Sequence, residues 1–286
     1  MEMFSPVHKS LENLRSVESP LERAKLAHEA VEYLTDTVIP DLYLTRLSAV
    51  EALISGGMPQ RQIAEELNVS RGRVSQMLRQ GKEEKAFFGD GRITIAVGAK
   101  PESNRADSAQ KFVISSQAMQ AAQTLIDGMR SFGLDSVMEQ VPPPGNVNLN
   151  RKNLLVMTSP RLLPFLGQVV ASDPNIGFEE RSEGWCLIDR ESGQVYSAPG
   201  EASHQKDFAY IGRLPRPDGN GTFLYVAGIH SEGTLGGAQW LIDNVSSLYG
   251  RVKNRIFSTI VQVESNSETE EITQVQPVTK IFQRKS

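Results

Sequence analysis

The sequence has little cysteine and no long apolar run, and both absences exclude classes of protein. Cys186 is the single cysteine. It cannot form an internal disulfide or a metal site built from several cysteines, and it fits a reducing cytoplasm. No run of about 18 apolar residues occurs, and the amino-terminal residues lack the apolar core of a signal peptide. We therefore expect a soluble cytoplasmic protein with no membrane partner.

An excess of positive charge is also missing. The formal net charge is -4, which argues against a histone-like basic coat but leaves room for a local basic patch. With 39% hydrophobic and 22% charged residues, the chain can bury an ordinary globular core. Its 286 residues correspond to about two domains.

Two amphipathic helices are predicted in the first part of the chain. Ser19 is a plausible N-cap and Pro20 occupies the first helical position. Apolar residues then follow at helical spacing: Leu21, Ala24, Ala27, Val31 and Leu34. Pro40 interrupts this helix. A second helix is expected over residues 41–54, closed by the glycines at 56 and 57.

The segment from Met58 to Lys85 has helix-turn-helix spacing. Residues 60–67 read as a short helix whose inward face carries Ile63, Ala64 and Leu67. Asn68 and Val69 make a tight turn, and Ser70 caps a second helix that runs to about residue 80.

The same segment resembles the helix-turn-helix in the fourth region of sigma factors and its relatives in bacterial regulators. The recurring frame IAxxLxVSxxxVSxxL is matched by Ile63, Ala64, Leu67, Val69, Ser70, Val74, Ser75 and Leu78. The preceding helices lack the basic and aromatic strand-melting segment of a sigma factor. The resemblance therefore implies a regulator with a sigma-like helix-turn-helix.

In such a unit the second helix lies in the major groove of double-stranded DNA. Val74 and Leu78, four residues apart, are expected to face the core. Arginine can pair with guanine, glutamine with adenine, and basic side chains with phosphates. The predicted DNA-binding residues are Ser70, Arg71, Arg73, Ser75, Gln76, Arg79 and Lys82. The alternative is a three-helix protein-interaction module with a solvated basic face.

One helix-turn-helix reads only a few base pairs, so useful specificity requires a homodimer on a two-fold site. The apolar stripes from Leu21 to Val31 and from Leu44 to Ile54 are the candidate dimer element. Alternatively, they complete a helical bundle within each monomer.

The second part of the chain alternates strands and helices. Strands are expected over residues 92–100, 134–142, 152–160, 206–217, 222–229 and 257–265, a hairpin over 184–199, and helices over 115–133, 161–172 and 235–249. We predict an α/β protein in which residues 1–90 form a helical helix-turn-helix DNA-binding domain. Residues 91–286 form a Rossmann-like α/β ligand-sensing domain with a mixed sheet.

This second part is similar to a domain that accompanies helix-turn-helix proteins of actinobacteria. The likeness rests on a PPPG loop, a strand that ends in SP, and the segments RLPRPDG and AGIHSEGTLGG, over residues 92–265. It supports the order of the two domains and implies no particular ligand.

The segment FLYVAGIHSEGTLGG raises the question of what its glycines do. Gly228 and Gly233 are spaced as in a P-loop, but Thr234 and Leu235 replace the required lysine and hydroxyl residue. The G-x-G-x-x-G fingerprint is also absent. What remains is a small-residue loop between a buried strand and a helix amino terminus, a place that favours an anion. Alternatively, the glycines let the helix pack closely on the sheet, with Thr234 as its N-cap.

Candidate ligand-binding side chains follow several strand ends. Arginines and hydroxyls around a helix amino terminus suit the phosphate or carboxylate of a small anionic or nucleotide-like ligand. The predicted ligand-binding residues are Thr158, Ser159, Arg161, Arg213, Arg216, Gly228, His230, Ser231, Gly233 and Thr234.

Evidence for catalysis is weak in this sequence. His230 and Glu232 could form a proton-transfer pair with Asp189 as a third member, but their spacing guarantees no shared geometry. Cys186 reads as a buried, inert thiol. No metal-ligand spacing involves the remaining histidines, His8, His28 and His204. We expect no catalytic residue, metal or cofactor; the alternatives are a nucleotide-processing hydrolase and a non-catalytic dimerisation or partner-binding module.

Overall fold

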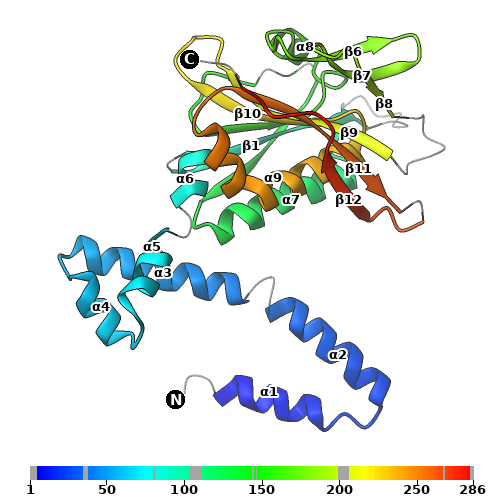
Figure 1. Ribbon diagram of the computed structural model, residues 1–286. Helices are drawn as coiled ribbons and strands as arrows, with labels where there is room; N and C mark the ends of the chain where they lie inside the picture. Colours follow the sequence, from blue (N-terminus) through cyan, green and yellow to red (C-terminus); the bar gives the residue numbers. More distant parts are fainter. Residues whose placement is uncertain are drawn as a thin grey trace. The chain divides into compact units, whose positions relative to one another are not determined.

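The computed structural model (Figure 1) describes residues 5–34, 38–79, 82–89, 91–102, 111–143, 145, 147–198, 206–266 and 268–283. The chain divides into two compact units, Met1–Leu78 and Arg79–Ser286. Across the described ranges, no helix combines the length and the apolar character needed to cross a membrane.

The described residues of the first unit form helices. Their bounds are α1 Ser5–Arg15, α2 Pro20–Tyr33, α3 Ile39–Ser55, α4 Gln60–Glu66 and α5 Arg71–Arg79. The predicted cap of α2 is confirmed, because the hydroxyl of Ser19 accepts a hydrogen bond from the N–H of Glu22 at 3.4 Å. Pro40 lies in the first turn of α3, where its missing N–H has no intrahelical acceptor to lose. It therefore starts a helix instead of only ending one.

A sharp turn joins α4 to α5. Asn68 adopts a left-handed backbone with φ 51°, a conformation that asparagine tolerates better than most residues. The hydroxyl of Ser70 accepts from the N–H of Arg73 at 3.1 Å, which caps α5 as predicted. The two helices pack on α3 around a small core of Ile63 and Ala64 from α4, Val74 from α5 and Val50 from α3.

One apolar prediction for the first unit is wrong. Leu67 is 41% exposed, because it is the C-cap residue of α4 and the chain turns there. The stripe on α2, for which both a dimer contact and burial within the monomer were left open, is largely uncovered, with Leu21 at 68% and Val31 at 60% exposure. The described helices of this unit therefore do not bury the apolar stripe of α2.

The second unit is built on an eight-stranded mixed sheet, as the α/β prediction required. The strand order is β12-β11-β9-β10-β5-β1-β4, and β13 pairs with β11. Strands β4, β1, β5 and β10 are parallel to one another, whereas β9, β11 and β12 add antiparallel pairs. The bounds are β1 Ile93–Gly98, β4 Ser136–Val141, β5 Leu154–Met157, β9 Lys206–Pro215, β10 Thr222–Gly228, β11 Phe257–Ser265, β12 Ile272–Pro277 and β13 Phe282–Gln283.

Both faces of the sheet are covered (Figure 1). One face packs against α6 Lys82–Phe88, α7 Ser116–Ser131 and α9 Ser231–Val252. The other packs against α8 Phe165–Val170 and a small sheet of β6 Ile176–Arg181, β7 Gly184–Asp189 and β8 Val195–Ser197. The two short strands β2 Lys100–Pro101 and β3 Phe112–Val113 pair antiparallel with each other. Phe87 and Phe88 lie in the core under α9, so the units divide before residue 90.

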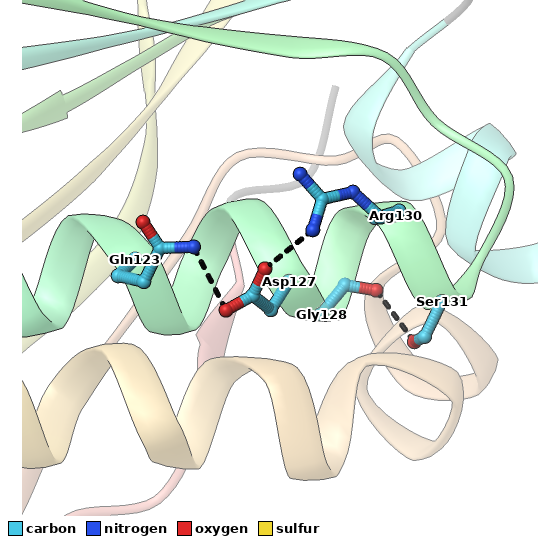
Figure 2. A network of polar contacts seen from close by, with 5 residues as sticks. All are labelled: Gln123, Asp127, Gly128, Arg130 and Ser131. Carbon is cyan, nitrogen blue, oxygen red and sulfur yellow. Dashed lines mark hydrogen bonds and ion pairs between the residues drawn. The ribbon is translucent and has the colours of Figure 1, made fainter. Parts of the chain in front are cut away.

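Helices α7 and α9 lie side by side, and Gly128 sets how close they come (Figure 2). A Cβ at position 128 would lie 2.6 Å from side-chain atoms of Ile242 on α9. On the other flank of α7, Asp127 accepts from Gln123 at 2.9 Å and from Arg130 at 2.8 Å (Figure 2). Gly128 therefore faces α9, whereas Gln123, Asp127 and Arg130 are exposed.

The largest correction in the second unit concerns the start of α9. This helix begins at Ser231 instead of Leu235, so Gly233, which the prediction left in the loop, is helical. Strand β6 was not predicted. The β7–β8 hairpin is confirmed, with Gly193 at φ 76° in its turn.

Candidate functional site

A pocket of about 100 Å³ opens where the parallel strands β1, β5 and β10 end. The register aligns these ends, because Met157 pairs with Val97 on one side and with Val226 on the other. The amino-terminal ends of α7 and α9 complete the walls. Parallel strands with helix amino termini at their carboxyl ends are the usual place for a ligand in an α/β sheet.

Most of the predicted ligand-binding residues come together in this pocket. Its wall includes Thr158, Ser159, Arg161, Gly228, His230, Ser231 and Thr234. Lys100, Ser115 and Gly98 belong to the same wall and were not predicted. They lie at the end of β1, on β2 and at the N-cap of α7, and they were missed because a sequence does not show that these segments are neighbours of β5 and β10.

Three buried polar residues line this pocket, namely Thr158, Ser159 and Thr234, and Thr158 differs from the other two in its hydrogen bonding. Its side chain is 5% exposed, and within the described residues its hydroxyl oxygen has no hydrogen-bond partner. The backbone carbonyl of Thr158 accepts from the hydroxyl of Tyr225 at 2.7 Å, so only the side chain lacks a partner. Gly98 makes the room, since a Cβ there would lie 2.0 Å from the Thr158 hydroxyl oxygen.

The amino terminus of α9 already holds a carboxylate from the protein itself. Asp207, on β9, accepts hydrogen bonds from the N–H groups of Gly233 at 2.6 Å and His230 at 3.0 Å. The side chain is buried. The N–H of Gly233, a predicted ligand-binding residue, therefore donates to this internal carboxylate, and Gly233 does not line the pocket.

Asp207 was missed by the sequence analysis. The antiparallel pairing of Ala209 with Gly228 brings it beside the loop, and no local pattern marks that pairing. Burial raises the pKa of Asp207 to about 6, while the hydrogen bonds from Phe208, Gly233 and His230 and the charge of His230 oppose the increase. The Asp207 carboxyl therefore lies where the amino terminus of α9 would bind an anion, although its burial disfavours the charged form.

The glycines of the segment serve close packing. A Cβ at Gly228 would lie 2.3 Å from the backbone of His230 and Thr234, and one at Gly236 would lie 2.4 Å from Val263. Thr234 is not the N-cap. Its hydroxyl accepts from the N–H of Gly228 at 2.9 Å and ties the strand end to the helix. The packing interpretation therefore accounts for these glycines.

Arg213 and Arg216 do not reach this pocket. Strand β9 runs antiparallel to β10, so Arg213 pairs with Leu224 near the start of β10 and lies at the opposite end from Gly228. The prediction placed the ends of both strands at one edge, and this is wrong because that rule holds only for parallel strands. Arg216 instead donates to the carbonyls of Thr222 at 3.3 Å and Asn220 at 3.2 Å across a turn.

Arg213 has a structural role instead. Its buried guanidinium donates to the carbonyls of Phe87 at 2.6 Å and Lys253 at 2.7 Å, and it stacks 4.4 Å from the Phe87 ring centre. Burial lowers the pKa of Arg213 to about 10. The residue ties α6 and the end of α9 to the sheet.

The proposed catalytic trio is not assembled. Asp189 accepts from the N–H groups of Glu191 and Ser192 in the β7–β8 turn, away from the pocket wall that holds His230. Glu232 accepts from the hydroxyl of Ser231 at 3.3 Å. Burial raises the pKa of the Cys186 thiol, as expected for an inert cysteine. Over the described ranges, no three histidine, cysteine, aspartate or glutamate side chains are grouped as metal ligands.

The second candidate surface is the exposed side of α5. Arg71 and Arg73 are exposed in its first turn, and Ser70 caps it. Ser75 is partly buried, and its hydroxyl donates to the side chain of Gln60 on α4 at 3.2 Å. Ser75 thus joins the two helices instead of facing outward. The side chains of the other three predicted DNA contacts lie outside the described residues: Gln76, Arg79 and Lys82.

Comparison of the chain with protein-family models, with curated proteins and with solved structures finds no match. The resemblance of residues 58–85 to a sigma-like helix-turn-helix therefore stays a prediction.

Proposed function

We propose that the chain is a DNA-binding transcriptional regulator controlled by a small anionic ligand. The observation that carries the proposal is the geometry of α4 and α5. A Ser70-capped helix exposes Arg71 and Arg73, while Val74 on its other side is fully buried against Ile63. A short helix fixed in this way by its partner presents its amino-terminal side chains to the major groove.

The two arginines of α5 supply both kinds of DNA contact. A guanidinium can donate two parallel hydrogen bonds to guanine, or it can neutralise a phosphate. The Ser75–Gln60 bond holds the angle between the two helices, which determines whether both arginines reach one groove. In this proposal Ser75 is a positioning residue.

The uncovered stripe on α2 supports a dimer. An isolated helix of 14 residues is marginal in water, and α2 leaves Leu21, Leu26 and Val31 exposed. A second copy that covers this stripe would place two α5 helices on a two-fold site. We include the homodimer in the proposal.

The ligand half of the proposal uses the second unit as a Rossmann-like sensing domain. Strands β4, β1, β5 and β10 share one carboxyl edge, and the pocket with Thr158 lies there. Binding that differs between two arrangements of the protein shifts the balance between them, and a regulator needs that coupling.

The test is DNA binding by the full chain. A pool of random duplexes is enriched for binders, and the affinity of the best sequence is measured by fluorescence anisotropy over a range of salt concentrations. In Arg71→Ala/Arg73→Ala we expect affinity to fall by about tenfold or more and the salt slope to drop by about two phosphate contacts.

The matched control is Arg92→Ala/Arg130→Ala, which removes the same charge from exposed sites of the second unit. It should leave the salt slope within error. If enrichment yields no binder, or if both double variants behave alike, α5 is not a recognition helix and the partner-binding alternative takes its place.

A further inference from the structure

We infer that the pocket at the carboxyl ends of β1, β5 and β10 binds a phosphate group. This deepens the ligand half of the proposed function and rests on that half alone, because it requires nothing of α5. The wall includes Thr158, Ser159 and Ser231, and none of the described aspartates or glutamates belongs to it. A wall of donors without carboxylates suits an oxyanion.

Two cations stand at this pocket. Lys100 on β2 and Arg161 after β5 belong to its wall, and both side chains are exposed. In the part of the chain that the structure describes, neither forms an ion pair. Surface cations that face a shared pocket without a carboxylate partner are free to neutralise a dianion.

The buried hydroxyl of Thr158 is an independent sign of a ligand. A buried polar group without a partner is costly, and native proteins rarely keep one without a reason. Here Gly98, the last residue of β1, provides the space that the hydroxyl of Thr158 occupies just after β5, and both residues line the pocket. A ligand oxygen that accepts from Thr158 would remove the cost.

The amino terminus of α9 adds backbone donors. Asp207 takes the N–H groups of His230 and Gly233. The N–H groups of Ser231 and Glu232 can donate to a ligand, since the first residues of a helix have no intrahelical acceptor. The helix dipole favours negative charge there, and Ser231 is itself on the pocket wall.

The volume of the pocket and the directions of its donors favour phosphate over other anions. A pocket of about 100 Å³ is well below the roughly 300 to 1,000 Å³ typical of whole-ligand sites, so it holds one anionic group and not a nucleoside. Donors come from β2, the end of β5 and α9, that is, from several directions. A tetrahedral dianion can meet all of them, whereas a planar carboxylate meets donors in one plane.

The experiment is titration calorimetry on the full chain without DNA, at constant ionic strength adjusted with sodium chloride. The probes are inorganic phosphate, sulfate, glycerol phosphate and acetate. We expect phosphate, sulfate and glycerol phosphate to bind and acetate to bind at least about fivefold more weakly. Tighter binding of glycerol phosphate than of inorganic phosphate identifies a phosphoryl ester as the ligand, and the reverse identifies free phosphate.

Variants map the site. Thr158→Val keeps the side-chain shape and removes the hydroxyl, and Arg161→Ala removes an exposed cation that no core contact depends on. Each should weaken phosphate binding by about tenfold. Arg130→Ala removes an exposed cation on α7 that pairs with Asp127, away from the pocket wall (Figure 2). This control should change binding by less than about twofold.

Some results would overturn the inference. They are no phosphate binding up to about 10 mM, tighter binding of acetate than of phosphate, or binding that neither Thr158→Val nor Arg161→Ala alters. Because Arg161 is exposed, Arg161→Ala still tests phosphate binding at this pocket even if Thr158→Val folds poorly. These titrations contain no DNA, so their failure is separate from failure of the α5 experiment.

Discussion

Asp207 shows at the scale of one residue how a buried carboxyl is both held and penalised. It accepts three backbone N–H bonds, including one from Phe208 at 2.8 Å, yet its pKa is raised to about 6 by burial. The ordinary value is 3.8. The folded state therefore keeps a proton over a pH range in which the unfolded chain has released it.

This predicts the pH dependence that Asp207 contributes. The stabilisation is fully present below about pH 4 and is lost as pH rises through about 6, with a slope of at most about 1.4 kcal/mol per pH unit. The measurement is the free energy of unfolding of Asp207→Asn and of the unaltered chain from pH 4 to 8. The free energy of unfolding of the unaltered chain, relative to that of Asp207→Asn, should decrease between pH 4 and 6 and then level off.

The comparison is best repeated in a His230→Gln background, because the charge of His230 lowers the pKa of Asp207. A difference that shifts in favour of the unaltered chain as pH rises would mean that the N–H bonds outweigh burial.

Arg213 is the residue whose loss should be felt most in the second unit. In Arg213→Met, the carbonyls of Phe87 and Lys253 lose their donors inside the core. We expect the free energy of unfolding to fall by about 2 to 4 kcal/mol, measured by urea titration. Arg213→Lys should recover less than half, since one ammonium cannot span both carbonyls. A loss below about 0.5 kcal/mol in the methionine variant would contradict this role.

At the scale of helices, two glycines predict opposite effects of the same substitution. Gly128→Ala places a Cβ 2.6 Å from Ile242 and should destabilise the chain by about 1 to 2 kcal/mol, after the gain in helix propensity is subtracted. Gly250→Ala, in α9, meets nothing within 4 Å and should stabilise it by up to about 1 kcal/mol.

Thermal unfolding of both glycine variants checks this pair. A double-mutant cycle with Ile242→Ala identifies the cause, because Gly128→Ala should cost less when the isoleucine is shortened. Equal effects at positions 128 and 250 would show that the α7–α9 approach does not depend on Gly128.

At the scale of the whole molecule, the prediction concerns assembly. If a second copy covers the α2 stripe, light scattering should give twice the chain mass of 31.5 kDa. Leu21→Glu/Val31→Glu should return the protein to a monomer and weaken DNA binding. The control is Met119→Glu, on an equally apolar but isolated exposed site of α7 at 43% exposure. A monomeric unaltered chain would remove the dimer from the proposal.

Local sequence patterns predicted much of the fold correctly. Side-chain caps at Ser19 and Ser70, the turn at Asn68 and the apolar runs of β1, β5 and β10 depend on residues close in the sequence, and each is where we predicted it. Seven of the ten predicted ligand-binding residues line the pocket for the same reason, since they lie at or after the ends of the parallel strands β5 and β10.

Other features depended on which segments meet. Leu67 was misplaced because helical spacing does not say where a short helix ends against its partner. Arg213 was assigned to the wrong end of the sheet because strand direction is not written in an apolar run. Asp207 was overlooked because its hydrogen-bond partners lie beyond the next strand.

By itself, the sequence determined many of the elements, the α/β class and the strand ends that carry hydroxyls, because those follow from propensity, periodicity and local capping. Only the tertiary structure decided that Asp207 occupies the start of α9 and that the glycines serve packing. The tertiary structure also places the hydroxyl of Thr158 beside Gly98, where it has no hydrogen-bond partner among the described residues. These outcomes arise from pairing between distant strands, where direction and register place each side chain and no local pattern specifies either.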